Sequence, residues 1–180
     1  MPPKLLVDLS RLDLTQVAIP IEEIREVNPQ RYEMEQLSGI ITYRPDLGYV
    51  VGFRDIRPDE FWVRGHIPGR PLFPGVLMIE AAAQLSSFYY KLFVGKDDPH
   101  FVGFGGVTDV KFRRTVDPGD RLIIIALCRE LKSRRAVFDT QEVVGDRLVF
   151  EGTIIGMPVG EVPGGPPGAY EAGGREGAQG

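Results

Sequence analysis

One stretch of the chain has the length of a single long helix and is too apolar to lie in water. Residues 74–93 begin at Pro74 and stop before Gly95, and glycine is a common residue at the end of a helix. A helix that is apolar on nearly every side is buried. We therefore expect the rest of the chain to wrap around it. Its apolar side chains are Val76, Leu77, Ile79, Ala81, Ala82, Leu85, Phe88, Tyr89 and Leu92.

The segments on both sides of this helix have the composition and turns of strands, apart from a short helix expected at residues 22–27. Glycines within residues 103–106 predict a bulge in the first strand after the long helix. Strands grouped on either side of a single helix indicate an α+β fold, with an antiparallel sheet packed on that helix. The expected strands are residues 39–44, 48–54, 100–112, 121–131, 134–144 and 147–157.

The C-terminal part of the chain differs sharply in composition from the rest. Residues 156–180 contain nine glycines and four prolines. Such a segment buries too little apolar surface to offset the entropy lost on ordering. We therefore expect one domain over residues 1–157 and a disordered tail over residues 158–180.

The composition argues against several classes of function. A net charge of −4 is unlike the basic footprint of nucleic-acid binding proteins. One cysteine, Cys128, and two histidines, His66 and His100, offer little for a metal site. Residues 1–20 lack the long apolar run of a secretory signal or a membrane span. A cytoplasmic protein without a bound metal is the expectation.

A histidine precedes the long helix in a loop that its own residues restrict. His66 opens a run of ten residues with three prolines and two glycines, so its position should be well defined. Pro74 is suited to the first helical position. The amides of Gly75 and Val76 would follow it, without partners inside the helix. Together with the helix dipole, these amides could polarise a carbonyl oxygen.

A carboxylate interrupts the apolar helix about 9 Å from its start, at Glu80. Gln84 lies four residues on, within reach of that carboxylate. Ser87 and Lys91 continue the same stripe, so helix periodicity alone favours the simpler reading of a solvated helix face. His66, taken alone, fits an ordinary surface or structural histidine.

The combination of these groups suits proton transfer next to a carbonyl. His66 could remove a proton α to the carbonyl, and the amides at the helix start could stabilise the enolate. Glu80 could protonate a leaving group, because burial favours the neutral form of a carboxyl.

Two motifs resemble one known family. Residues 65–84, GHIPGRPLFPGVLMIEAAAQ, are similar to the signature of the β-hydroxyacyl-acyl carrier protein dehydratases, with Ile67 in place of the usual phenylalanine. Residues 110–122, VKFRRTVDPGDRL, resemble a second block of that family. The similarity covers most of the expected domain.

The resemblance implies a hot-dog fold, in which a curved sheet wraps a central helix, and a homodimer that can assemble as a trimer of dimers. His66 of one subunit would face Glu80 of the other. His66 would act as the base at C2, and Glu80 would assist loss of the C3 hydroxyl. The amide of Gly75, with Val76, would hold the thioester oxygen, and Gln84 would orient the carboxyl. Glutamate rather than aspartate at position 80 implies dehydration without isomerisation.

The same resemblance implies a substrate carried on the phosphopantetheine of an acyl carrier protein, in fatty-acid or related biosynthesis, and implies no other cofactor. An acidic carrier would contact basic residues at the tunnel mouth. The first candidates are Arg70, Lys111, Arg113 and Arg114, and a second cluster is Lys132, Arg134 and Arg135. Ordinary surface charge is the alternative reading of both clusters.

One segment departs from the family pattern. Residues 29–38, PQRYEMEQLS, have Gln30, Glu33 and Ser38 where the family usually has histidine, proline and aspartate. This departure leaves the acyl chain length open. It also leaves open a non-catalytic acyl-binding or scaffolding subunit. An acyl thioesterase on the same fold is a separate alternative.

Overall fold

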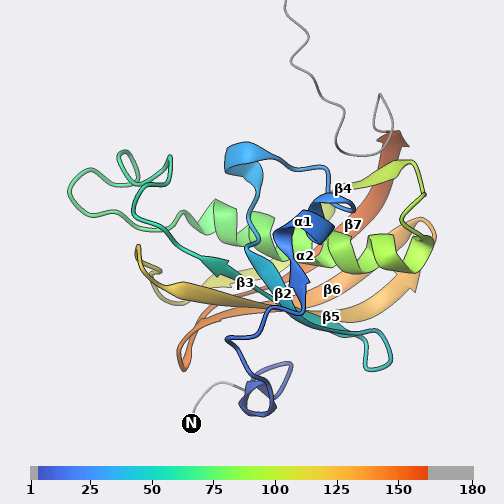
Figure 1. Cartoon of the computed structure of the whole chain (residues 1–180), viewed down its shortest axis with the longest axis horizontal. Coiled ribbons are helices and arrows are strands. Elements are labelled where there is room, and N and C mark those ends of the chain that lie inside the picture. The colour runs from blue at the N-terminus through green and yellow to red at the C-terminus, as the bar shows by residue number, and fades with distance from the viewer. Residues whose placement is uncertain (1–3, 162–180) are drawn as a thin grey trace, which may run out of the picture.

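The computed structural model describes residues 4–161 and has one long helix lying across a curved antiparallel sheet (Figure 1). The strand order is β1-β2-β3-β5-β6-β7-β4, which confirms the α+β fold expected from the sequence. The strands are β1 (Ile19–Pro20), β2 (Gly39–Arg44), β3 (Tyr49–Asp55), β4 (His100–Phe112), β5 (Arg121–Lys132), β6 (Arg135–Val144) and β7 (Arg147–Glu161). The helices are α1 (Ile21–Arg25) and α2 (Gly75–Val94), with 3-10 turns at Leu9–Arg11 and Tyr32–Met34.

The long helix α2 begins and ends close to the predicted residues. Pro74 has ψ 129°, an extended conformation, so it caps the helix and Gly75 is the first helical residue. The expectation that Pro74 itself is the first helical residue is therefore wrong by one position. At the other end, Gly95 has φ 107° and its amide donates to the carbonyl of Lys91 at 3.0 Å. A positive φ favours glycine, which explains the stop at this residue.

The main core lies between α2 and the concave face of the sheet. Leu85 and Phe88 of α2 are almost fully buried, together with Ile124 of β5 and Phe150 of β7. Burial of each such side chain contributes about 1.5–3 kcal/mol. Gly52 in β3 permits the close approach of the helix, because an added Cβ would lie 2.9 Å from Cδ1 of Leu85.

The other face of the sheet is also covered. Val7 and Leu9 of the N-terminal segment pack on Val51 and Ile125, and the amide of Leu6 donates to Oε1 of Gln141 at 2.8 Å. An antiparallel sheet can leave one face in water. Here the N-terminal segment turns that face into a second core.

The edge strand β4 is long and irregular. It pairs only with β7 in the described part of the chain, and its register shifts at three places, one of them between Phe104 and Gly106. The bulge predicted from the glycines at 103–106 is thereby confirmed. Large apolar side chains are exposed on and beside this edge, including Phe104, Phe112, Met157 and Val159. An edge of this kind is a template for pairing with another chain.

The expected domain limit falls inside a strand. β7 continues to Glu161, beyond the limit expected at residue 157. The remainder of the expected tail, residues 162–180, lies outside the described residues. Between residues 4 and 161, neither helix combines the length and hydropathy that a membrane span requires.

Candidate active site

Glu80 opens onto a cavity that runs beside α2. With its open mouth, the cavity takes in roughly 550 Å³ of space. Its lining mixes polar side chains, among them Glu80, Gln84 and Gln30, with apolar ones such as Phe104 and Phe138. The complete lining is Gln30, Glu80, Ala83, Gln84, Ser86, Ser87, Tyr90, Val102, Gly103, Phe104, Ala136, Phe138, Ile154, Ile155 and Gly156. The arrangement suits a carboxyl group that acts at the polar part of an extended apolar ligand.

Gln84 fixes the carboxyl group of Glu80. Its Nε2 donates to Oε1 of Glu80 at 2.7 Å and to the carbonyl of Met34 at 2.7 Å. Its Oε1 accepts from the amide of Gln36 at 2.9 Å. Gln84 is 3% exposed, so these contacts hold it in one orientation. The structure therefore supports the predicted neighbourhood of residues 80 and 84.

Burial raises the pKa of Glu80, and the hydrogen bond from Gln84 opposes that rise. Burial disfavours the charged form of a carboxyl because it removes the water that solvates the charge. A carboxyl whose pKa is raised in this way keeps a proton available for donation at higher pH.

The stripe that follows Glu80 on α2 is buried rather than solvated. Ser87 and Lys91 are each 6% exposed. The Nζ of Lys91 donates to the carbonyls of Asp98 and His100 at 2.5 and 3.1 Å. The reading of these residues as a solvated helix face is therefore wrong, because the sheet and the loop after α2 cover that face.

His66 lies exposed on the loop that projects beyond the N-terminal end of α2 (Figure 1). Its amide donates to the carbonyl of Trp62 at 2.7 Å, and its carbonyl accepts from the amide of Leu72 at 2.8 Å. The peptide bond between His66 and Ile67 is cis. Two backbone hydrogen bonds thus hold the histidine at both of its polar main-chain groups.

The ring of His66 is oriented as well. Its Nδ1 lies 2.8 Å from the carbonyl oxygen of Leu72. A carbonyl can only accept, so we assign the proton to Nδ1, which leaves Nε2 as the basic nitrogen of the neutral ring. This tautomer suits a general base.

His66 does not line the cavity of Glu80 within a single chain. The sequence resemblance places the two residues in different subunits of a dimer, and that pairing remains a prediction. The single chain therefore supplies two separate halves of the expected site.

The start of α2 is closely covered on one side. An added Cβ on Gly75 would lie 2.8 Å from Cε1 of Phe112, so a larger residue there would have to push that ring aside. The amides of Leu77 and Met78 donate to the carbonyl of Pro74 at 2.9 and 3.3 Å. Among the described hydrogen bonds none uses the amide of Gly75 or Val76, which agrees with free donors at a helix start.

The basic residues expected to bind a carrier are all exposed, but most are paired. Arg70 lies 3.7 Å from Oδ1 of Asp117. Lys111 and Arg113 share the carboxylate of Glu151, at 3.3 and 2.6 Å. Arg114 is exposed as well.

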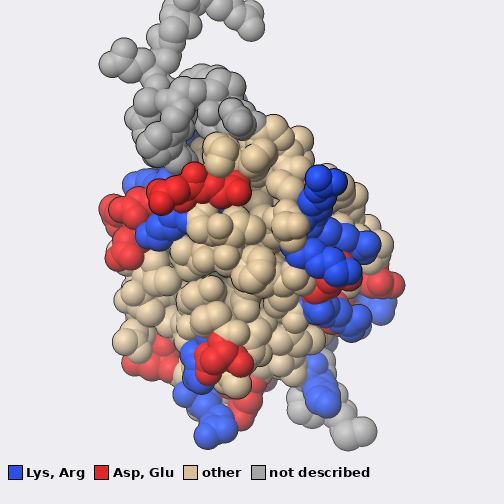
Figure 2. Space-filling model, turned by 90° about the vertical axis from the view of Figure 1, so that its right-hand side faces the viewer, with Lys and Arg blue, Asp and Glu red and all other residues tan. Residues whose placement is uncertain are grey.

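The second basic cluster lies at the turn between β5 and β6, where Arg134 and Arg135 are exposed and Lys132 pairs with Glu130 at 3.0 Å. Figure 2 shows that the middle of the face seen from the right-hand side of Figure 1 is uncharged, with basic and acidic groups both placed around its rim. The structure therefore does not choose between the two clusters.

Sequence reasoning missed two sets of residues around the site. Gln30 lines the cavity, although the sequence marked it only as a departure from the family pattern. Arg54 and Glu60 form a buried ion pair next to the His66 loop. The cavity joins Gln30 to segments far along the chain. Arg54 and Glu60 are only six residues apart, across the loop after β3, and no helix or strand pattern predicts a contact there.

Comparisons with known proteins agree with this geometry. Residues 28–153 match the family model described as FabA-like domain. The chain is 34% identical over 135 residues to the 3-hydroxyacyl-[acyl-carrier-protein] dehydratase FabZ of Natranaerobius thermophilus, covering 74% of this chain and 93% of that protein. It is 30% identical over 138 residues to FabZ of Erwinia tasmaniensis, covering 76% and 91%.

A solved structure shares the fold. The dehydratase heterocomplex ApeI:P from Xenorhabdus doucetiae superposes with a TM-score of 0.65 at 15% identity, over 76% of this chain and 91% of that one. This similarity supports the hot-dog fold that the sequence motifs implied. With the family match over residues 28–153 and the identities above, the chain belongs to the FabA-like, hot-dog family of 3-hydroxyacyl-acyl carrier protein dehydratases.

Proposed function

We propose that this protein removes water from a 3-hydroxyacyl thioester carried on acyl carrier protein, giving the trans-2-enoyl thioester in fatty-acid or related biosynthesis. The names of its curated relatives support this reaction. The observation that carries it is the partly buried Glu80, held by Gln84 at 2.7 Å in a cavity that apolar side chains such as Phe104 and Phe138 also line.

The reaction needs one base, one acid and one oxyanion site. Nε2 of His66 takes the proton from C2, and the electron pair moves toward the thioester carbonyl. The amide of Gly75, with that of Val76, donates to the carbonyl oxygen as negative charge develops there. Glu80 gives its proton to the C3 hydroxyl, which leaves as water while the C2–C3 double bond forms. Proton exchange then restores neutral His66 and protonated Glu80.

A second copy of the chain would complete the site. His66 and Glu80 lie apart in one chain, and β4 offers a long unpaired edge with apolar residues beside it. A two-fold symmetric dimer formed along β4 would bury Phe104 and Phe112 and create two equivalent sites. We propose this homodimer, with a trimer of dimers as its higher assembly.

The carrier would dock through basic residues near the mouth. Arg70, Lys111, Arg113 and Arg114 are exposed and come from the two segments that also carry the family motifs. Binding through such charges weakens as salt rises. The phosphopantetheine arm delivers the substrate, so the reaction calls for no further cofactor. We propose the cytoplasm as the site of this chemistry.

The test is a dehydration assay with 3-hydroxyacyl-acyl carrier proteins of several chain lengths. His66→Ala and Glu80→Gln should each lower kcat by about 10²- to 10⁴-fold, because each removes one proton-transfer group. His100→Ala and Glu23→Gln are matched controls at exposed positions and should keep wild-type turnover. The same assay in the hydration direction should show which enoyl chain lengths the cavity accepts.

Other outcomes would point to other functions. Release of free thiol without formation of an enoyl product would indicate a thioesterase. Normal pathway output from a host that carries only His66→Ala would indicate a non-catalytic acyl-binding or scaffolding subunit.

A further inference from the structure

We infer that the buried ion pair between Arg54 and Glu60 positions both halves of the catalytic apparatus. This inference rests on the proposed function and assigns two further positioning residues to the same site. The pair belongs to neither family motif discussed above and contacts neither the cavity nor the imidazole.

The pair is enclosed on all sides. The side chains of Arg54 and Glu60 are 9% and 7% exposed, and the guanidinium carbon lies 5.4 Å from the ring centre of Phe73. Besides Arg54, the carboxylate of Glu60 accepts from the amide of Arg57 and from Nε1 of Trp62, both at 2.9 Å. Three donors therefore converge on one buried carboxylate.

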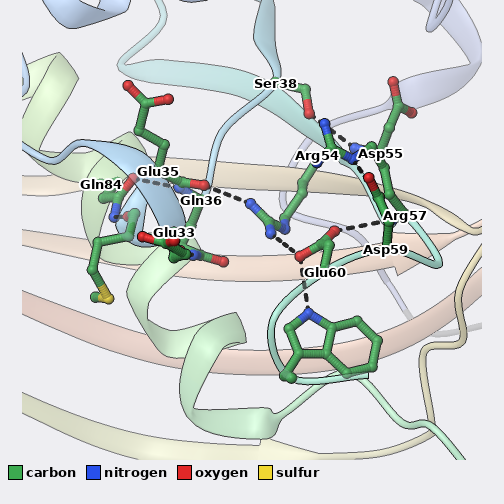
Figure 3. Close-up of polar contacts among 12 residues, drawn as sticks. Glu33, Glu35, Gln36, Ser38, Arg54, Asp55, Arg57, Asp59, Glu60 and Gln84 are labelled. Carbon is green, nitrogen blue, oxygen red and sulfur yellow. Dashed lines mark hydrogen bonds and ion pairs between the residues drawn. The ribbon is translucent and has the colours of Figure 1, made fainter. Parts of the chain in front are cut away.

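One branch of the network leads to the acid. The NH1 group of Arg54 donates to the carbonyl of Glu35 at 2.7 Å. The next residue, Gln36, uses its amide to donate to Oε1 of Gln84 at 2.9 Å. Gln84 then holds Glu80. Figure 3 shows Arg54 between Glu35 and Gln36 on one side and Glu60 on the other, with Gln84 farther away beyond Glu35. The guanidinium of Arg54 thus fixes the backbone at Glu35 and Gln36, and this backbone orients Gln84 beside Glu80.

The other branch leads to the base. Trp62 is tied to Glu60 through its indole N–H, and its ring packs edge-on against Phe73 with centres 5.5 Å apart. The carbonyl of Trp62 accepts from the amides of Gly65 and His66, at 3.1 and 2.7 Å. The position of His66 on its loop therefore depends on the position of Trp62.

A buried ion pair contributes more to the orientation of the groups around it than to stability. Desolvation offsets most of its attraction, so apolar side chains of similar size would hold the core equally well. Apolar side chains form no hydrogen bonds, so they cannot fix the directions of a peptide carbonyl and an indole N–H at the same time. Because Glu80 and His66 of one chain serve different sites in the proposed dimer, the network joins an acid of one site to the base of the other.

Trp62→Phe is the sharpest variant, because it deletes one N–H and keeps a ring against Phe73. We expect kcat to fall about ten- to a hundredfold, as misplacement of a catalytic group does, while KM stays close to wild type. The melting temperature should fall as well, because Trp62 is 4% exposed and its smaller replacement leaves the carboxylate of Glu60 with one donor fewer. Arg54→Met should also lower kcat, and Arg54→Lys should restore part of it, because the ammonium still reaches Glu60. Arg44→Met is the matched control, since it breaks an exposed pair with Asp46.

Two results would overturn this inference. If Trp62→Phe and Arg54→Lys keep wild-type kcat while only the melting temperature falls, the pair supports the fold and nothing more. If Arg44→Met lowers kcat as much as Arg54→Met, the effect is not specific to the buried pair. Failure of the proposed function would look different, because the unaltered chain itself would then form no enoyl product.

Discussion

The two halves of the site are built in opposite ways. Glu80 lies on a buried helix, and its partner Gln84 makes three hydrogen bonds. His66 lies on an exposed loop that backbone hydrogen bonds and the anchor at Trp62 hold in place. The difference suits the roles that the proposed mechanism gives to the two residues. The acid needs desolvation to keep its proton, whereas the base needs an open nitrogen that a second chain can cover.

The largest expected effect tests whether the two halves come from different chains. His66→Ala and Glu80→Gln subunits, each nearly inactive alone, should regain about a quarter of wild-type activity when mixed one to one and allowed to exchange. Half of the dimers would then be mixed, and each would hold one intact site. Turnover of the mixture is the measurement, with each variant alone as its control. Activity no higher than the sum of the two variants would show that the halves do not meet across subunits.

Replacement of Gln84 should weaken only the half of the site that carries Glu80 on helix α2. Gln84→Leu leaves the amide of Gln36 and the carbonyl of Met34 without partners, so chemical denaturation should show a loss of about 2–4 kcal/mol in the free energy of unfolding. Gln16→Leu, at an exposed position, is the matched control.

The same variant should move the pH dependence of turnover. The hydrogen bond from Gln84 lowers the pKa of Glu80, so its loss raises that pKa further. Since only protonated Glu80 can donate, turnover falls as pH rises through this pKa. The alkaline limb of the kcat profile should therefore shift to higher pH. A limb that stays in place, or moves to lower pH, would contradict the role of Glu80 as the acid.

A second buried carboxyl group, that of Glu142, can be compared with Glu80, the proposed catalytic acid. Glu142 on β6 is 0% exposed, and neither carboxylate oxygen has a described hydrogen-bond partner. Glu142→Leu should raise the free energy of unfolding by about 1–3 kcal/mol at neutral pH, because it removes an unpaired buried polar group. Glu23→Gln serves as the exposed control.

Glu142 should also make stability depend on pH. Burial raises its pKa well above the ordinary value of a glutamate, so the folded state binds more protons than the unfolded state above that ordinary value. Its favourable contribution is complete at low pH and is lost as pH rises toward the folded-state pKa. Denaturation of the wild type and Glu142→Leu across this range should give curves that separate as pH rises; parallel curves would argue against a protonated Glu142.

The smallest effect on stability is expected in the loop that carries His66. Ile67 is 51% exposed, so Ile67→Phe should change the free energy of unfolding by less than about 0.5 kcal/mol. Thermal melting at several protein concentrations is the measurement. A larger, concentration-dependent change would show that a partner chain covers this residue.

The sequence by itself determined the main elements, because their signals are local. The apolar run after Pro74 predicted α2 nearly to its last residue, and Gly95 marked its end. The strand bounds at residues 39–44 match β2. The motif over residues 65–84 also named His66, Glu80 and Gln84 before any contact was known.

Tertiary structure alone decided which polar groups are buried and what they contact. Helical periodicity left the stripe of Ser87 and Lys91 open to either reading, because it cannot tell which face meets the sheet. The hydrogen bond from Arg54 to Glu35 joins β3 to a segment that precedes β2, and the same guanidinium binds Glu60 across the loop after β3. Burial and long-range hydrogen bonds arise from the packing of the whole chain, so no window of sequence contains them.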